Sequence, residues 1–291
     1  MGLVESSRSD RPENSSKDPE INRMIRDKAL TIGINYTGSR NELRGCVNDS
    51  KNIRKLLIDL GYPEQRILSL NDQDYPPESP NYPTRENILR ALYWLTTDSS
   101  VEEYTSSPDI YLIESKLPFD HRCFLHYSGH GSQSSTTNAK EHDGHDETIM
   151  PVDFEVSGSI TDDLLYRVLN RLEKGCGLQA LMDCCCSGTN LDLPYVYQSG
   201  KVRHDSGSYE TNAEFQQFSA VMDDQFAIDL ASSGAMTTAF IEVIEKQGNE
   251  GKVDELVKKM NKVVRRLVGK GKHQVCYSSG KYFRVGDKIK L

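Results

Sequence analysis

Short apolar runs that alternate with helical stretches are the feature that most restricts how this chain can fold. Four apolar runs predict buried strands, at residues 28–36, 65–72, 122–128 and 178–185. Apolar residues at helical spacing, bounded by helix-start and helix-stop residues, predict helices at 46–60, 84–98 and 161–175. This order is typical of an α/β fold with a mostly parallel sheet and helices on both faces.

The rest of the chain completes this pattern. Two further helical stretches, 234–246 and 252–270, are followed by a last predicted strand at 274–285. Between them and the fourth strand lies a polar segment, "QSGKVRHDSGSYETNAEFQQ", for which no strand is predicted. Residues 1–24 are rich in Ser, Asp, Glu, Asn and Pro, so we expect a disordered tail, followed by one catalytic domain at 25–291.

Charge and hydropathy exclude two classes of partner. The 291 residues carry a formal net charge of −8, whereas a general nucleic-acid binder needs an excess of Lys and Arg. No apolar run approaches the roughly 20 residues of a membrane helix, and the polar start lacks a secretory signal core. We therefore expect a monomeric protein of the cytoplasm, with the nucleus as a second compartment.

The seven cysteines include three in a row, in "MDCCCSG", directly after the fourth strand. Their number is odd and no signal peptide is visible, so reduced thiols are expected. The third strand runs into "HYSGHGSQ". Functional groups in such sheets gather at the carboxyl ends of the strands, so the turn with His130 and the turn with the cysteines should meet there.

A cysteine beside a histidine has the chemistry of a nucleophile and its base. The thiolate attacks, the imidazole of His130 removes the thiol proton, and glycines on both sides of His130 free N–H groups for an oxyanion. Two other interpretations stay open for the cysteines. A cysteine at a strand end is often an inert buried residue. A soft-metal site is the other, although adjacent residues of an extended chain point to alternate faces and the chain has no C-x-x-C pair.

Seven short motifs, in order, resemble those of the metacaspases with a single catalytic domain. They are "LTIGINY", "LRGCVND", "PTRENI", "HYSGHGSQ", "MPVDF", "MDCCCSGTNLDLPY" and "SAVMDDQ", the strongest parts of a resemblance that extends from about Lys28 to about Ser279. The resemblance implies a caspase-like three-layer α/β sandwich. It also implies a cysteine endopeptidase that uses a Cys–His dyad, cleaves peptide and protein substrates after Arg or Lys, and requires Ca²⁺.

The same resemblance assigns the catalytic positions. Cys185 matches the nucleophile, His130 the general base, and Gly131 and Cys185 the oxyanion donors. Cys186 stands where the family usually has a histidine, and the "FAID" stretch at 226–229 is less polar than in relatives. These departures keep an alternative open, in which the chain is a catalytically weak caspase-like scaffold or regulatory binding protein.

The implied specificity pocket is acidic. By resemblance, Asp49 and Asp183 point into it, and Cys46 and Ser128 line it. Two carboxylates favour a cationic side chain, and an Arg can be held by two parallel hydrogen bonds. Without the resemblance, Asp49 would be interpreted as a helix cap or a surface charge.

A second set of carboxylates matches the calcium ligands of the family: Asp146, Asp162, Asp163 and Asp192. Hard oxygen donors from separate loops suit Ca²⁺, although Asp162 and Asp163 could also cap a helix. Relatives cleave themselves in the region of the polar segment, where Lys201 and Arg203 are the candidate sites.

Overall fold

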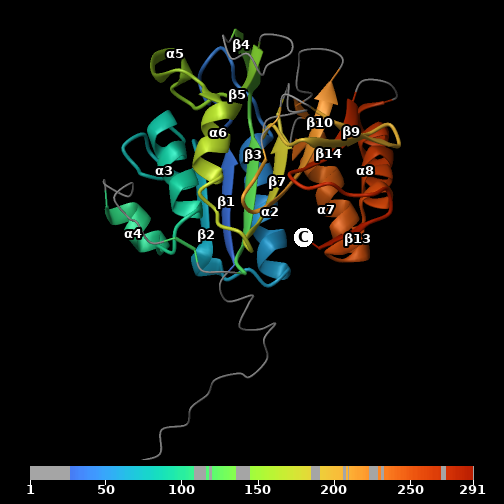
Figure 1. Ribbon diagram of the computed structural model, residues 1–291. Coiled ribbons are helices and arrows are strands. Elements are labelled where there is room, and N and C mark those ends of the chain that lie inside the picture. Colours follow the sequence, from blue (N-terminus) through green and yellow to red (C-terminus); the bar gives the residue numbers. More distant parts are fainter. Residues whose placement is uncertain are drawn as a thin grey trace, which may run out of the picture.

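The computed structural model describes residues 27–107, 116–117, 120–135, 145–184, 191–205, 208, 210–222, 229–230, 233–269 and 273–290. An eight-stranded sheet is its centre, in the order β2-β1-β3-β7-β10-β14-β8-β9 (Figure 1). The strands are β1 (Lys28–Gly33), β2 (Ile67–Asn71), β3 (Arg122–Ser128), β7 (Gly177–Asp183), β8 (Tyr195–Gln198), β9 (Lys201–His204), β10 (Glu214–Met222) and β14 (His273–Ser279). The first five in spatial order are parallel, and the last three pair antiparallel.

Helices cover both faces of this sheet, which confirms the predicted α/β sandwich (Figure 1). One buried apolar cluster contains side chains of α3 (Arg85–Leu95) and α6 (Asp162–Leu169). The other contains side chains of α2 (Cys46–Asp59), α7 (Ala235–Gln247) and α8 (Val253–Val268). Each helix is amphipathic and buries its apolar stripe against the strands, so the sheet is shielded on both sides.

The remaining elements are short and lie at both ends of the strands. They are η1 (Glu64–Arg66), α4 (Val101–Ser106), β4 (Gly131–Ser135), β5 (His145–Ile149), α5 (Phe154–Ser157), β6 (Ile160–Thr161), β11 (Asp229–Leu230), β12 (Ser233–Gly234), β13 (Glu250–Lys252) and β15 (Lys288–Lys290). A small sheet of β4, β5 and β6 begins directly after His130, which anchors the turn that carries this residue.

Local capping explains where the helices begin and end. The Thr84 hydroxyl accepts a hydrogen bond from the backbone N–H of Asn87, and Thr161, not Asp162, caps α6 in the same way. The helix predicted at 161–175 is shorter than expected. It stops at Leu169, because the chain then turns so that Leu172 is buried in the core.

The polar segment after the fourth strand contains strands that its sequence did not predict. β8 and β9 form a hairpin whose two turn residues, Ser199 and Gly200, have φ values of 52° and 82°. Such positive φ angles match the twist of a two-residue hairpin. β10 follows and buries Phe215 and Phe218, and it joins the parallel and antiparallel parts of the sheet.

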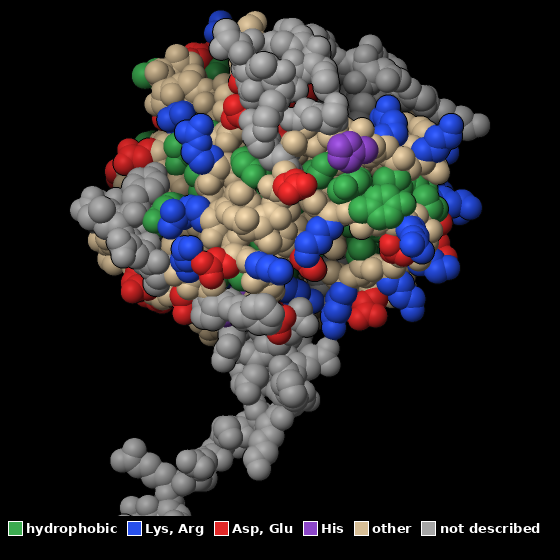
Figure 2. Space-filling view, viewed as in Figure 1, with side chains coloured by type: hydrophobic (Ala, Val, Ile, Leu, Met, Phe, Trp, Pro, Cys, Tyr) green, Lys and Arg blue, Asp and Glu red, His purple; other side chains and the backbone are tan. Residues whose placement is uncertain are grey.

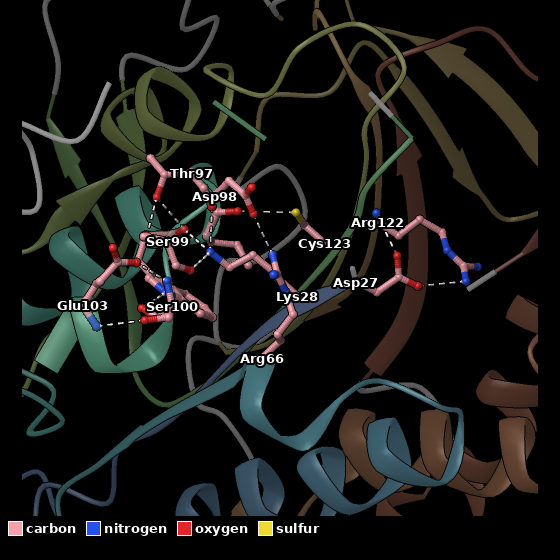
Figure 3. A network of polar contacts seen from close by, with 12 residues as sticks. Asp27, Lys28, Arg66, Thr97, Asp98, Ser99, Ser100, Glu103, Arg122 and Cys123 are labelled. Carbon is pink, nitrogen blue, oxygen red and sulfur yellow. Dashed lines mark hydrogen bonds and ion pairs between the residues drawn. The ribbon is translucent and has the colours of Figure 1, made fainter. Parts of the chain in front are cut away.

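A buried lysine marks the amino end of β1 (Figure 3). Lys28 is completely buried, and its ammonium donates to the carbonyl oxygens of Trp94 at 2.7 Å, Thr97 at 2.7 Å and Ser99 at 3.0 Å. It also lies 3.7 Å from the centroid of the Trp94 ring. Burial lowers the pKa of Lys28 to about 7. These contacts bind β1 to the end of α3, since the carbonyls that follow a helix otherwise lack donors.

The outer surface mixes both signs of charge. In Figure 2, blue and red side chains are interspersed over the described part of the visible face, without one dominant basic patch there. None of the described helices combines the length and apolar character that a membrane span requires.

Candidate functional site

The site lies where β3 and β7 end side by side. Ser128, the last residue of β3, pairs with Asp183, the last residue of β7, and the Gly129 N–H lies 3.4 Å from the Asp183 carbonyl. The chain continues to Cys184, which is buried. The predicted nucleophile Cys185 comes next and lies outside the described residues, as do positions 186–190. The described strands therefore deliver the cysteine turn to the edge of the sheet that carries His130.

His130 is held by two neighbours from the segment after β1. Its Nε2 lies 2.8 Å from the carbonyl oxygen of Asn41, and its backbone N–H donates to Tyr36 Oη at 3.0 Å. The rings of Tyr36 and His130 lie 4.8 Å apart. A carbonyl oxygen can only accept, so Nε2 carries the proton that faces it. In the neutral imidazole the other nitrogen, Nδ1, is then the one that can take up a proton.

Tyr36 supports the turn as an uncharged group. Its hydroxyl donates to the Met150 carbonyl at 2.6 Å and lies 3.2 Å from the Tyr127 hydroxyl. Burial raises the pKa of Tyr36 strongly, and nearby Cys46 and Cys184 raise it further. The phenol therefore stays protonated and holds the backbone around His130 in place.

Asp49 and Asp183 both accept hydrogen bonds from the start of α7. Asp49 is completely buried; the Ser128 hydroxyl donates to its Oδ2 at 2.7 Å, and the Gly234 N–H lies 2.9 Å from both of its oxygens. The Thr237 N–H donates to Asp183 Oδ2 at 2.7 Å. Asp49 is thus neither a surface charge nor a cap of its own helix, whose N-cap is Gly45.

The four predicted pocket residues occupy neighbouring positions in this arrangement. Ser128 contacts Asp49, and Asp183 ends the adjacent strand. Cys46 is the buried first residue of α2, three positions before Asp49. The result is a small acidic region beside the turn of His130.

A separate group of carboxylates contains two of the four predicted calcium ligands. Oxygens of Glu147, Asp162 and Asp192 all lie within 4.8 Å of one another. Glu147 was not predicted. Its neighbour Asp146 is buried and is not among the three grouped residues, and its Oδ1 accepts no hydrogen bond from the part of the chain that the structure describes. Asp163 is half-buried beside Asp162 and is not among the three grouped residues.

Asp162 is the electrostatic centre of this group. It is completely buried, and its two oxygens accept the backbone N–H groups of Glu147 and Asp163, each at 2.7 Å. Burial raises the pKa of Asp162 well above its usual range, and the charge of Asp192 raises it further. A divalent cation would remove this cost. Three carboxylates that converge from separate elements fit a hard ion such as Ca²⁺.

The candidate self-processing residues lie on an edge strand. Lys201 and Arg203 are exposed members of β9, which pairs with β8 on one side only. The sequence suggested a polar loop here, and the structure instead forms a hairpin. Self-cleavage at either residue stays a prediction.

Several residues that shape the site had no local signal in the sequence. Asn41, Tyr36, Gly234 and Thr237 act through contacts with residues distant in the chain. Glu147 is an exception, because it directly follows Asp146 in "HDET" and could have been included with the acidic candidates.

Comparison with known proteins adds relatives to this geometry. The chain is 42% identical over 176 residues to Metacaspase-1B of Neurospora crassa, covering 60% of this chain and 37% of that protein. It is 42% identical over 196 residues to Metacaspase-1 of Scheffersomyces stipitis, covering 65% and 44%. The chain thus spans less than half the length of these curated relatives.

A solved structure and a family model cover more of the chain. The crystal structure of protein GSU0716 from Geobacter sulfurreducens matches with a TM-score of 0.58 at 21% identity, covering 87% of this chain and 93% of the other, which shows a shared fold. The family model described as the caspase domain matches residues 26–284. With that match across nearly the whole of its folded part, the chain belongs to the caspase domain family.

Proposed function

We propose that the protein is a calcium-dependent cysteine endopeptidase that cleaves after Arg or Lys. The observation that carries this proposal is the convergence of three groups at the ends of β3 and β7: an imidazole with Nδ1 available, a pair of carboxylates, and the start of the cysteine turn. The metacaspase relatives support a peptidase of this class.

The reaction assigned to this site is acyl transfer through Cys185. His130 Nδ1 takes the thiol proton, and the thiolate attacks the carbonyl carbon of the substrate. The oxyanion that forms is held by the backbone N–H groups of Gly131 and Cys185. His130 then returns the proton to the leaving amine, and water releases the acyl group in a second, similar step. The Asn41 carbonyl supports the imidazolium, since it already accepts the Nε2 proton.

Specificity follows from charge. Asp49 and Asp183 together place two negative charges in the pocket, which attract the guanidinium of Arg or the ammonium of Lys. An acidic side chain would meet like charge and is rejected.

Calcium is assigned to the second group of carboxylates. Asp162 and Asp192, with Glu147 beside them and Asp146 and Asp163 as neighbours, are the residues that would hold it. The ion supplies positive charge that offsets the cost of these buried carboxylates. Asp192 lies seven residues after Cys185, so an ion held by Asp192 would also restrict the segment that follows the nucleophile.

The test is a fluorogenic peptide that ends in Arg, assayed beside matched peptides that end in citrulline or Asp. We expect cleavage of the Arg peptide in millimolar-range Ca²⁺ and little in chelator, no cleavage by Cys185→Ala, and retained cleavage by the matched control Cys184→Ala. Equal cleavage of the Asp peptide would overturn the specificity. No turnover of any peptide by a folded protein would favour the scaffold alternative.

A further inference from the structure

The first turn of α7 is bound to both acidic residues of the pocket. Gly234 is the N-cap residue of this helix, and Thr237 is its third helical residue. The Gly234 N–H lies 2.9 Å from both oxygens of Asp49, and the Thr237 N–H lies 2.7 Å from Asp183 Oδ2. The carboxylates come 185 and 54 residues earlier in the chain than their donors.

This arrangement is a capping box assembled from other elements. In a capping box, the N-cap side chain accepts the N–H of the third helical residue, and a side chain at that third position accepts the N-cap N–H. Helix α7 has no side-chain cap of its own. Asp183 fills the first role and Asp49 fills the second.

We infer that Gly234 and Thr237 are positioning residues for substrate specificity, and that they act by fixing the two pocket carboxylates. This inference rests on the proposed preference for Arg and Lys. Asp49 is buried and Asp183 is half-buried beside it, so the two carboxylates repel each other, and N–H groups at a helix start offset that repulsion. The pocket is therefore assembled before a substrate cation arrives, so the free energy of binding is not reduced by the cost of ordering the pocket.

Gly234 must be glycine for reasons of space. Its φ of −69° and ψ of 146° are open to any residue, so backbone strain does not require glycine there. A Cβ at this position would lie 2.2 Å from Asp183 Oδ2 and 2.9 Å from Asp49 Oδ2. Any side chain would push the two carboxylates away from the amides that hold them.

Gly177 offers a matched control within β7, the strand that ends in Asp183. A Cβ at Gly177 has its nearest neighbours, Arg122 Cγ and the Glu214 carbonyl oxygen, at 3.9 Å, which is ordinary contact. Gly177→Ala also adds one methyl group, here on the strand that ends in Asp183, and this methyl group does not displace the pocket carboxylates.

The experiment compares kcat/KM for an Arg peptide and its citrulline analogue, an uncharged side chain of the same shape. Gly234→Ala should lower the Arg-to-citrulline ratio by about 10- to 100-fold, the range expected when hydrogen bonds to charged groups are lost. Most of that loss should be in KM. The rate at which iodoacetamide alkylates Cys185 should stay within about twofold of wild type, because this reagent has no cation to place. Gly177→Ala should match wild type in the Arg-to-citrulline ratio, in KM and in the alkylation rate.

A second variant covers the case in which Gly234→Ala fails to fold. An amide-to-ester replacement at Thr237, introduced as the α-hydroxy analogue of threonine, removes one N–H and adds no atoms. It should lower the same ratio. A ratio unchanged in both variants, while wild type prefers Arg, would overturn the inference and leave the proposed function standing. A wild type that does not discriminate Arg from citrulline would overturn the proposed function itself.

Discussion

The two acidic groups of this protein differ in what balances their charge. Asp49 and Asp183 receive hydrogen bonds from Ser128 and from the start of α7. The group around Asp162 has less compensation, since burial and the charge of Asp192 raise the pKa of Asp162. The first arrangement suits a ligand that comes and goes, such as a substrate side chain. The second suits an ion that stays bound.

The largest expected effect comes from removing one charge of the balanced pair. Asp183→Asn should lower kcat/KM for an Arg peptide by about 100- to 1,000-fold, because a desolvated charge partner of the substrate is lost. Steady-state kinetics with Arg and citrulline peptides measures this. The exposed Glu78→Gln variant is the control and should behave as wild type. An equal loss of kcat/KM for both peptides would mean that Asp183 does not distinguish a charged substrate side chain from an uncharged one.

A buried cation that is fully satisfied gives the next largest effect. Lys28→Met keeps the length of the side chain but removes the lysine donor from three backbone carbonyls, of which Trp94 still accepts from Thr97. We therefore expect a loss of about 2–4 kcal/mol in the free energy of unfolding. Urea unfolding measures it, and kcat/KM of the folded variant should be unchanged. Lys51→Met, at an exposed ion pair with Asp74, should cost less than about 1 kcal/mol. Similar losses in both variants would contradict this account of Lys28.

Removing the carboxylate of Asp162 should raise the free energy of unfolding, whereas the Lys28 variant lowers it. In chelator at pH 8, Asp162→Asn should unfold with a free energy about 1–2 kcal/mol higher than wild type. Burial and the charge of Asp192 raise the pKa of Asp162, so the folded wild type takes up a proton that the unfolded chain does not hold, and the amide avoids this cost. The folded-state pKa of Asp162 is raised, so its penalty exists above the pKa of the carboxyl in the unfolded chain and disappears below it. The difference should therefore vanish near pH 4.

In Ca²⁺, the wild type should become more stable than Asp162→Asn. Wild type should gain about 2–3 kcal/mol at a Ca²⁺ concentration of about 100 Kd, and Asp162→Asn should gain far less. Thermal melting with and without chelator follows both effects. Asp59→Asn, an exposed carboxylate on α2, serves as the control and should keep the full calcium response. A calcium response of wild-type size in Asp162→Asn would separate this residue from the ion.

The smallest effect concerns a neutral group beneath α7. His126 is completely buried, its Nε2 lies 3.2 Å from Thr237 Oγ1, and burial lowers its pKa to about 3. Protonation therefore favours the unfolded chain below the ordinary histidine pKa. His126→Gln keeps a hydrogen-bonding amide there without titrating. Between pH 6.5 and 5.5, wild type should lose about 1 kcal/mol more than this variant. If the free energies of unfolding of wild type and His126→Gln changed equally with pH, His126 would not be the group that titrates.

Much of the central fold was predictable because it depends on local patterns. The strands β1, β2, β3 and β7 are apolar runs, and the helices between them have clear capping residues such as Thr84. β10 was missed because its first part, "EFQQ", is polar, and its apolar residues become informative only beside β7 and β14.

The site was predictable only where a motif carried it. His130 was found from its place between two glycines at a predicted strand end, Asp49 and Asp183 were found by resemblance, and the structure brings the two aspartates together at Gly234. Asn41 and Gly234 were missed, because a carbonyl acceptor and a space-limited glycine leave no mark in a single sequence. Which group of carboxylates is balanced depends on partners up to 185 residues away.

The strand order has a consequence for a chain cut within β9. Everything before such a cut would form one polypeptide, and everything after it another. β7 and β8 belong to the first and β10 and β14 to the second, yet β10 and β14 lie between β7 and β8 in the sheet (Figure 1). The two polypeptides would be interleaved. Separating them would break the sheet between β7 and β10, between β14 and β8, and between β8 and the part of β9 after the cut. Processing would therefore yield two bands on a denaturing gel and one particle of unchanged size in gel filtration.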